Sequence, residues 1–149
     1  MRERDKFRYA ERCLYDYKRN VAGLKVLRED LRVMRSGLDV QAQNYQYKLE
    51  FTGTVSDPVQ ARLLKIEAIE ERIRMLERYT LPIGQLIEDI TAPEVMEYSE
   101  NKSLMGILRL MYFGKNPPDA VMEELKLGRR TFYRQRRELV NMTASYLAL

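Results

Sequence analysis

Residues 116–139 read NPPDAVMEELKLGRRTFYRQRREL, and the pattern of this stretch decides the fold. Val121 and Leu125 lie four residues apart, which places them on one face of a helix. Gly128 then precedes a second helical segment, in which Phe132 lies one turn from the start. The pattern predicts two helices joined by a tight turn, with Phe132 packed back onto Val121 and Leu125.

The start of the first of these helices has its own signals. Asn116 is expected to cap it, with Pro117 at the first helical position. In the second helix, Phe132 and Leu139 are expected to face inward, together with Met142 and Tyr146. The opposite face of that helix is then left to the solvent.

Positive charge is concentrated in the same stretch. Residues 126–138 hold six Lys or Arg and one Glu, a net charge of +5, whereas the whole chain carries only +4. Residues 36–125 hold nine basic and fifteen acidic residues, a net charge of −6. A basic cluster beside an acidic body is typical of a protein that binds a polyanion on one face. Residues 1–35 also carry +5, but charges of both signs alternate there, so we interpret them as solvated helix surface.

The outward face of the second helix supplies the candidate site. If Phe132 points inward, the side chains predicted to contact DNA bases are those of Arg130, Thr131, Arg134 and Arg137. An arginine guanidinium group can donate hydrogen bonds to both of the acceptors that guanine presents in the major groove. Flanking side chains are predicted to contact phosphates, namely Lys126, Arg129, Tyr133 and Arg136. The same surface could instead dock on an acidic protein.

Residues 125–134, LKLGRRTFYR, resemble the C-terminal helix-turn-helix of phage late-gene transcriptional activators of the RinA and ArpU type. That domain is similar to the region of sigma factors that binds the −35 promoter element. This chain departs from the family pattern at Met122, where a small residue is usual, at Lys126, in place of the turn glycine, and at Gly128, in place of a capping serine. The resemblance implies binding to double-stranded DNA at promoters and contact with host RNA polymerase.

The first half of the chain predicts long helices. Residues 3–38 are predicted to form one long helix, whose expected end is Gly37. An apolar stripe along it is made by residues at heptad spacing, namely Tyr17, Leu24, Leu31 and Leu38. Residues 39–55 lack helical periodicity and are expected to form a loop. A second heptad helix should begin after a cap at Asp57 and end near residue 80, because Pro82 follows. The two helices could pair within one chain, as an antiparallel hairpin, or between chains, as a homo-oligomer.

Shorter helices are expected after residue 82, at 83–90, from 93 towards 98, and at 103–113. The predicted fold is therefore all-α. We expect a long-helix scaffold or oligomerisation region at residues 1–80 and a helix-turn-helix domain at residues 81–149.

Composition excludes several kinds of chemistry. Histidine is absent and Cys13 is the only cysteine, so Ser-His-Asp and Cys-His catalysis and Cys/His zinc sites are excluded. We expect no catalytic residue, metal or cofactor, and Cys13 should be an ordinary free thiol. The charged N-terminus and the lack of a long apolar run predict no membrane association and a location in the cytoplasm of a bacterial host cell.

These features predict a sequence-specific DNA-binding regulator. The resemblance to the RinA and ArpU type implies that this regulator is a phage late-gene activator. The alternative is a small-terminase-like DNA-packaging subunit, which would also combine DNA binding with helical oligomerisation. An interaction protein that binds acidic partners is a third hypothesis.

Overall fold

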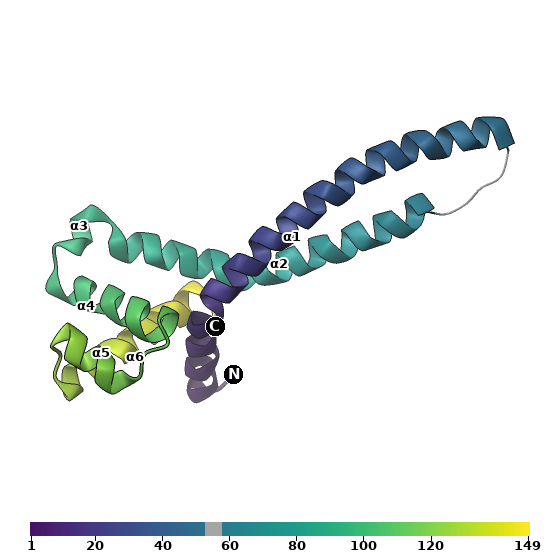
Figure 1. Ribbon diagram of the computed structural model, residues 1–149. Coiled ribbons are helices and arrows are strands. Elements are labelled where there is room, and N and C mark those ends of the chain that lie inside the picture. The colour runs from purple at the N-terminus through teal and green to yellow at the C-terminus, as the bar shows by residue number, and fades with distance from the viewer. Residues whose placement is uncertain (53–57) are drawn as a thin grey trace. The chain divides into compact units, whose positions relative to one another are not determined.

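The computed structural model describes the backbone of residues 1–52 and 58–149 and the side chains of residues 1–37 and 58–149. Throughout this part of the chain the regular structure is helical, which confirms the predicted all-α class (Figure 1). In chain order the elements are α1 (Glu3–Thr52), α2 (Pro58–Thr91), α3 (Pro93–Met96), α4 (Ser99–Ile107), the π-helical segment η1 (Leu108–Phe113), α5 (Pro118–Leu125) and α6 (Arg129–Tyr146). Among the described helices, none is both long enough and apolar enough to span a membrane.

The helices form two compact units. Val21–Glu77 is the hairpin unit, and Met1–Asn20 together with Arg78–Leu149 is the C-terminal unit. This division differs from the boundary predicted between residues 80 and 81, because the first twenty residues belong with the end of the chain. The reason is burial: one side of the start of α1 contributes Ala10, Cys13 and Leu14 to the core of the C-terminal unit.

In the hairpin unit, the part of α1 from Val21 onward and the part of α2 up to Glu77 run antiparallel within one chain. Leu24 from α1 is buried, as its heptad position predicts, and Ile66 and Ile73, seven residues apart on α2, are buried as well. Two ion pairs connect the helices, Arg28 with Glu77 at 3.0 Å and Arg35 with Glu70 at 3.1 Å. A step of seven residues forward on α1 corresponds to seven backward on α2, which is the register of an antiparallel pair. The intrachain hairpin is thus the arrangement that the structure adopts.

The first helix is longer than predicted. It continues through Gly37 to Thr52, so the expected stop at Gly37 and the expected loop over residues 39–52 are wrong. A single glycine inside a helix costs only about 1 kcal/mol, and no proline follows it before residue 58. The rest of the expected loop and the cap predicted at Asp57 fall in residues 53–57, outside the described residues.

The second helix also continues past its predicted end. Pro82 lies inside α2, and the helix reaches Thr91 rather than ending near residue 80. An internal proline costs about 3 kcal/mol or more. Beyond it, however, Ile83, Leu86 and Ile90 are buried in the C-terminal unit, and each buried aliphatic side chain contributes about 1.5–3 kcal/mol. Burial of these three side chains outweighs the cost of the proline, so one helix replaces the two that were predicted.

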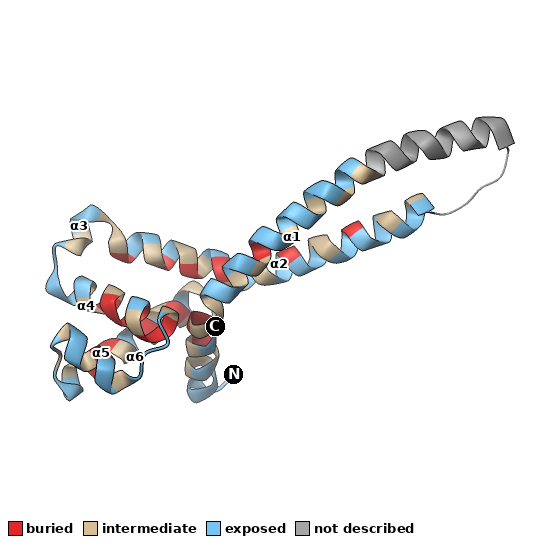
Figure 2. Cartoon of the chain, in the orientation of Figure 1, coloured by how far each residue is buried: buried red, intermediate tan, exposed pale blue. Residues whose placement is uncertain are grey.

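The core of the C-terminal unit lies where α4 and η1 meet α5 and α6, and buried residues gather on the facing sides of these elements (Figure 2). The helix predicted at residues 103–113 begins earlier, at Ser99, and becomes π-helical from Leu108. Its fully or almost fully buried side chains are Leu104, Ile107, Leu108, Met111 and Tyr112. Leu110 is partly buried against this cluster.

A three-residue connection, residues 126–128, joins α5 to α6. Lys126 adopts the left-handed conformation at φ 54° and ψ 43°, and the amide of Leu127 donates a 3.0 Å hydrogen bond to the carbonyl of Met122. Gly128 is the N-cap of α6, as predicted. The cap predicted for α5 is wrong by one residue, because Pro117 occupies the N-cap and Pro118 the first turn. Asn116 instead donates its side-chain amide to the carbonyl of Leu110, at the end of the preceding helix.

The left-handed turn leads to a prediction about stability. Lys126→Gly should raise the free energy of unfolding by about 0.5–1 kcal/mol, because glycine adopts this conformation without the clash of a Cβ atom. Urea denaturation followed by circular dichroism measures the change. As a matched control, Ala120→Gly, at an exposed position of α5, should lower the free energy of unfolding by about 1 kcal/mol. A Lys126→Gly protein less stable than the parent would contradict the argument.

A second prediction concerns the lone thiol. Cys13 is 8% exposed, and burial raises its pKa to about 11, with Asp16 adding to the effect. At pH 8 the thiolate fraction is therefore about a hundredfold below that of a free cysteine. The folded protein should react with a thiol-specific disulfide reagent at least about a hundredfold more slowly than the urea-unfolded protein. Equal rates would show that the thiol is accessible.

Candidate nucleic-acid interface

The helix α6 buries one side and exposes the other. Phe132 is 0% exposed, and the buried side continues along the helix through Gln135, Leu139, Val140 and Thr143. Met142 and Tyr146, which were predicted to face inward, are partly buried against the same core. Arg130, Arg134 and Arg137 are exposed on the other side. The rotation of α6 about its axis is therefore the one predicted from the position of Phe132.

The exposed side of α6 forms a basic surface groove, which we call the arginine groove. Its lining residues are Arg129, Arg130, Tyr133, Arg134 and Arg137. Arg129 lies over the ring of Tyr133, with 5.5 Å between the guanidinium carbon and the ring centroid. Arg134 approaches Glu100 at 3.6 Å, but both side chains are 63% exposed. An exposed pair of this kind holds the arginine only weakly.

The predicted base-contacting and phosphate-contacting residues are only partly brought together. Three of the four base candidates line the arginine groove, whereas Thr131 is half-buried and is not part of its lining. Of the phosphate candidates, Arg129 and Tyr133 line the groove and Lys126 is exposed in the turn before α6. The fourth, Arg136, has a different environment.

Arg136 is held by the start of α1. Its Nε and Nη2 atoms donate hydrogen bonds to the same Glu11 oxygen, at 2.9 and 2.5 Å. The Tyr112 hydroxyl donates a third to that oxygen, also at 2.9 Å. The Arg136 guanidinium also lies 5.9 Å from the ring centroids of Phe7 and Tyr133. We call Glu11, Tyr112 and Arg136 the Glu11 cluster; in it the predicted phosphate contact Arg136 is an internal ion-pair partner.

The Glu11 cluster was not predicted from the sequence, because its members are far apart in the chain. Glu11 and Arg136 are separated by 125 residues, and Glu11 and Tyr112 by 101. The only local sign is that Phe7, Glu11 and Leu14 follow the spacing of one helix face, with a carboxylate between two apolar residues.

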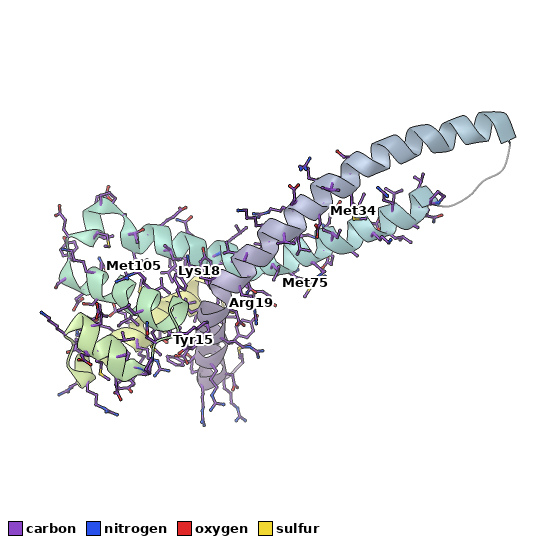
Figure 3. All side chains as sticks on the ribbon, in the orientation of Figure 1. Tyr15, Lys18, Arg19, Met34, Met75 and Met105 are labelled. Carbon is purple, nitrogen blue, oxygen red and sulfur yellow. The ribbon has the colours of Figure 1, made fainter. Side chains whose placement is uncertain are left out.

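Aromatic side chains surround the cluster. Tyr15, labelled in Figure 3, packs edge-on against Tyr112, with ring centroids 4.7 Å apart. Burial, together with the charge of Glu11, raises the pKa of Tyr112 well above its ordinary value, so its hydroxyl stays a neutral donor. Lys18, also labelled there, lies over Phe113, and Lys115 donates to the carbonyl of Tyr15. These contacts hold this part of α1 against η1 and the residues that follow it.

No set of His, Cys, Asp and Glu residues with the arrangement of a metal site occurs in the described part of the chain. Comparison of the chain with protein-family models, with curated proteins and with solved structures finds no match.

The Glu11 cluster leads to a stability prediction. Glu11→Ala should lower the free energy of unfolding by about 2 kcal/mol, because it leaves a largely buried guanidinium and a buried hydroxyl without their acceptor. Denaturant unfolding monitored by circular dichroism measures the loss.

Glu3→Ala is the matched control. Glu3 pairs with Lys6 on the exposed surface of the same helix, and its side chain is 90% exposed. Its removal should change stability by less than about 0.5 kcal/mol. Equal effects of the two substitutions would show that Glu11 contributes no more than a surface charge.

Proposed function

We propose that this chain is a sequence-specific DNA-binding transcriptional regulator that inserts α6 into the major groove. One observation carries the proposal: α6 follows a three-residue turn, buries one side from Phe132 onward and leaves Arg130, Arg134 and Arg137 exposed along the other. Helices that bind the major groove have this arrangement of an anchored inner side and a polar outer side.

The chemistry of the exposed side supports DNA over an acidic protein as the partner. Arg130, Arg134 and Arg137 follow one another at three- and four-residue steps, which aligns them along one edge of the helix. The guanidinium groups that line the arginine groove can make paired hydrogen bonds to guanine in the major groove. In this assignment Arg130 and Arg134 contact bases, Arg137 and Thr131 support them, and Lys126, Arg129 and Tyr133 contact phosphates.

The regulatory role rests on the resemblance of residues 125–134 to the helix-turn-helix of RinA- and ArpU-type phage late-gene activators. Under that assignment the protein binds near promoters and contacts host RNA polymerase. The turn is compatible with the pattern: Lys126, in place of the family's glycine, has the left-handed backbone that glycine favours.

A small-terminase-like packaging subunit is the second candidate. Apolar side chains left exposed on the hairpin unit favour it, because a ring of subunits needs helix contacts between chains. They are Val26 and Val33 on α1 and Leu64 and Met75 on α2; Met75 is labelled in Figure 3. Light scattering separates the candidates: a monomer or dimer supports the regulator, and a ring of many subunits supports packaging.

The DNA-binding test uses genomic fragments selected by the purified protein and a mixed-sequence duplex as the reference. Arg130→Ala with Arg134→Ala should weaken binding to the selected fragment by about 30-fold or more, because each lost base contact costs at least about 1 kcal/mol. Binding to the mixed-sequence duplex should weaken less, so the preference for the selected fragment should decrease.

The charge-matched control is Lys65→Ala with Arg72→Ala. Both residues are exposed on α2, and neither forms an ion pair within the described residues. This variant also loses two positive charges, but it should keep the parent's affinity and preference. A double arginine variant that binds like this control would overturn the assignment of α6. Enrichment of the fragments upstream of a gene cluster would support regulation, and enrichment at a packaging site would support the terminase.

A further inference from the structure

We infer that the first turns of α1 form a second DNA-contacting element, in which Arg4 and Arg8 bind backbone phosphates beside the α6 groove. The inference rests on the proposed function, since it adds contacts to the same bound duplex. It also changes the interpretation of the N-terminal charge, which the sequence alone presents as ordinary solvated surface.

The surface beside the arginine groove is shared by α6 and α1. A neighbouring surface groove is lined by Phe7, Tyr133, Arg136 and Arg137. Tyr133 and Arg137 therefore line both this groove and the arginine groove. Because Phe7 belongs to α1, the basic surface does not end at the edge of α6 but continues onto the first turns of α1.

The Glu11 cluster holds these turns in place. Glu11 accepts two hydrogen bonds from Arg136, and the Arg136 guanidinium lies over Phe7. The first turns of α1 are thus attached to the middle of α6 by an ion pair whose side chains are only 17% and 26% exposed. An element fixed in this way can present charge without a large ordering cost on binding.

Helical spacing places the two arginines beside this contact. Arg4 precedes Phe7 by three residues and Glu11 by seven, so all three share one face of α1. Arg8 lies one turn after Arg4 and extends the same side. Both arginines are exposed, and neither is ion-paired to another residue in the described ranges. Of the neighbouring carboxylates, Glu3 and Glu11 are paired with Lys6 and Arg136, and Asp5 is exposed and forms no ion pair within the described residues.

Phosphate contact is the function that fits this position. Arg4 and Arg8 belong to α1, which borders the groove shared with Arg137 through Phe7, and not to the edge of α6 that is assigned to the bases. An element beside a helix that occupies the major groove meets the sugar-phosphate backbone. Phosphate contacts add affinity and salt dependence but carry no sequence information. Loss of these arginines should therefore weaken binding to all duplexes equally, unlike loss of Arg130 and Arg134.

The test uses a double variant that carries both Arg4→Ala and Arg8→Ala. Its affinity for the selected fragment and for a mixed-sequence duplex is compared with that of the parent, from about 50 to 200 mM salt. The affinity should decrease by the same factor on both duplexes, and the slope of log K against log salt should become shallower by about 1–2. Arg4→Lys with Arg8→Lys should restore the slope, because lysine keeps the charge. Lys65→Ala with Arg72→Ala should leave the slope unchanged.

The outcomes separate this inference from the proposed function. If Arg130→Ala with Arg134→Ala reduces binding while the Arg4 and Arg8 variant matches the Lys65 and Arg72 control, α6 is the interface and the inference about α1 is overturned. If the parent protein binds neither duplex at about 50 mM salt, both are overturned. A decrease of affinity confined to the selected fragment would also overturn the inference, because it would assign base contacts to α1.

Discussion

Phe132 is completely buried at the start of α6, and its burial determines how the whole helix is rotated. With Phe132, Leu139 and Val140 inside, the three-to-four-residue spacing of a helix leaves Arg130, Arg134 and Arg137 outside. A guanidinium turned into this core would lose its hydration without gaining a partner, which costs far more than any packing gain. The same apolar contact therefore stabilises the C-terminal unit and also determines that these arginines face outward.

The second constraint is the attachment of α1 to α6. Glu11 accepts hydrogen bonds from Arg136 and Tyr112, so one carboxylate connects three helical segments that are distant in the chain. The aromatic rings of Phe7 and Tyr133 lie beside the Arg136 guanidinium, and the ring of Tyr15 packs against Tyr112. This arrangement makes the first turns of α1 part of the C-terminal unit. It also uses one of the six basic residues of the 126–138 cluster for structure.

Helix ends were the least predictable part of the fold, and the two long helices show why. Gly37 and Pro82 are local signals that favour an end, with costs of about 1 and 3 kcal/mol. Both were interpreted as stops, and α1 and α2 continue through them. At Pro82 the compensating energy comes from Ile83, Leu86 and Ile90, whose burial depends on helices that follow much later in the chain. A local pattern cannot include that contribution.

The sequence by itself determined the all-α class, the heptad seam of the long helices, the turn between α5 and α6, and the outward face of α6. These features depend on residues within a few helical turns of one another, where spacing alone decides which side chains share a face. Only the tertiary structure decided that the long helices pair within one chain, that residues 1–20 join the C-terminal unit, and that Arg136 is bound by Glu11. Those outcomes depend on contacts between residues as many as 125 positions apart, and they follow from which buried surfaces and charges can be satisfied together in three dimensions.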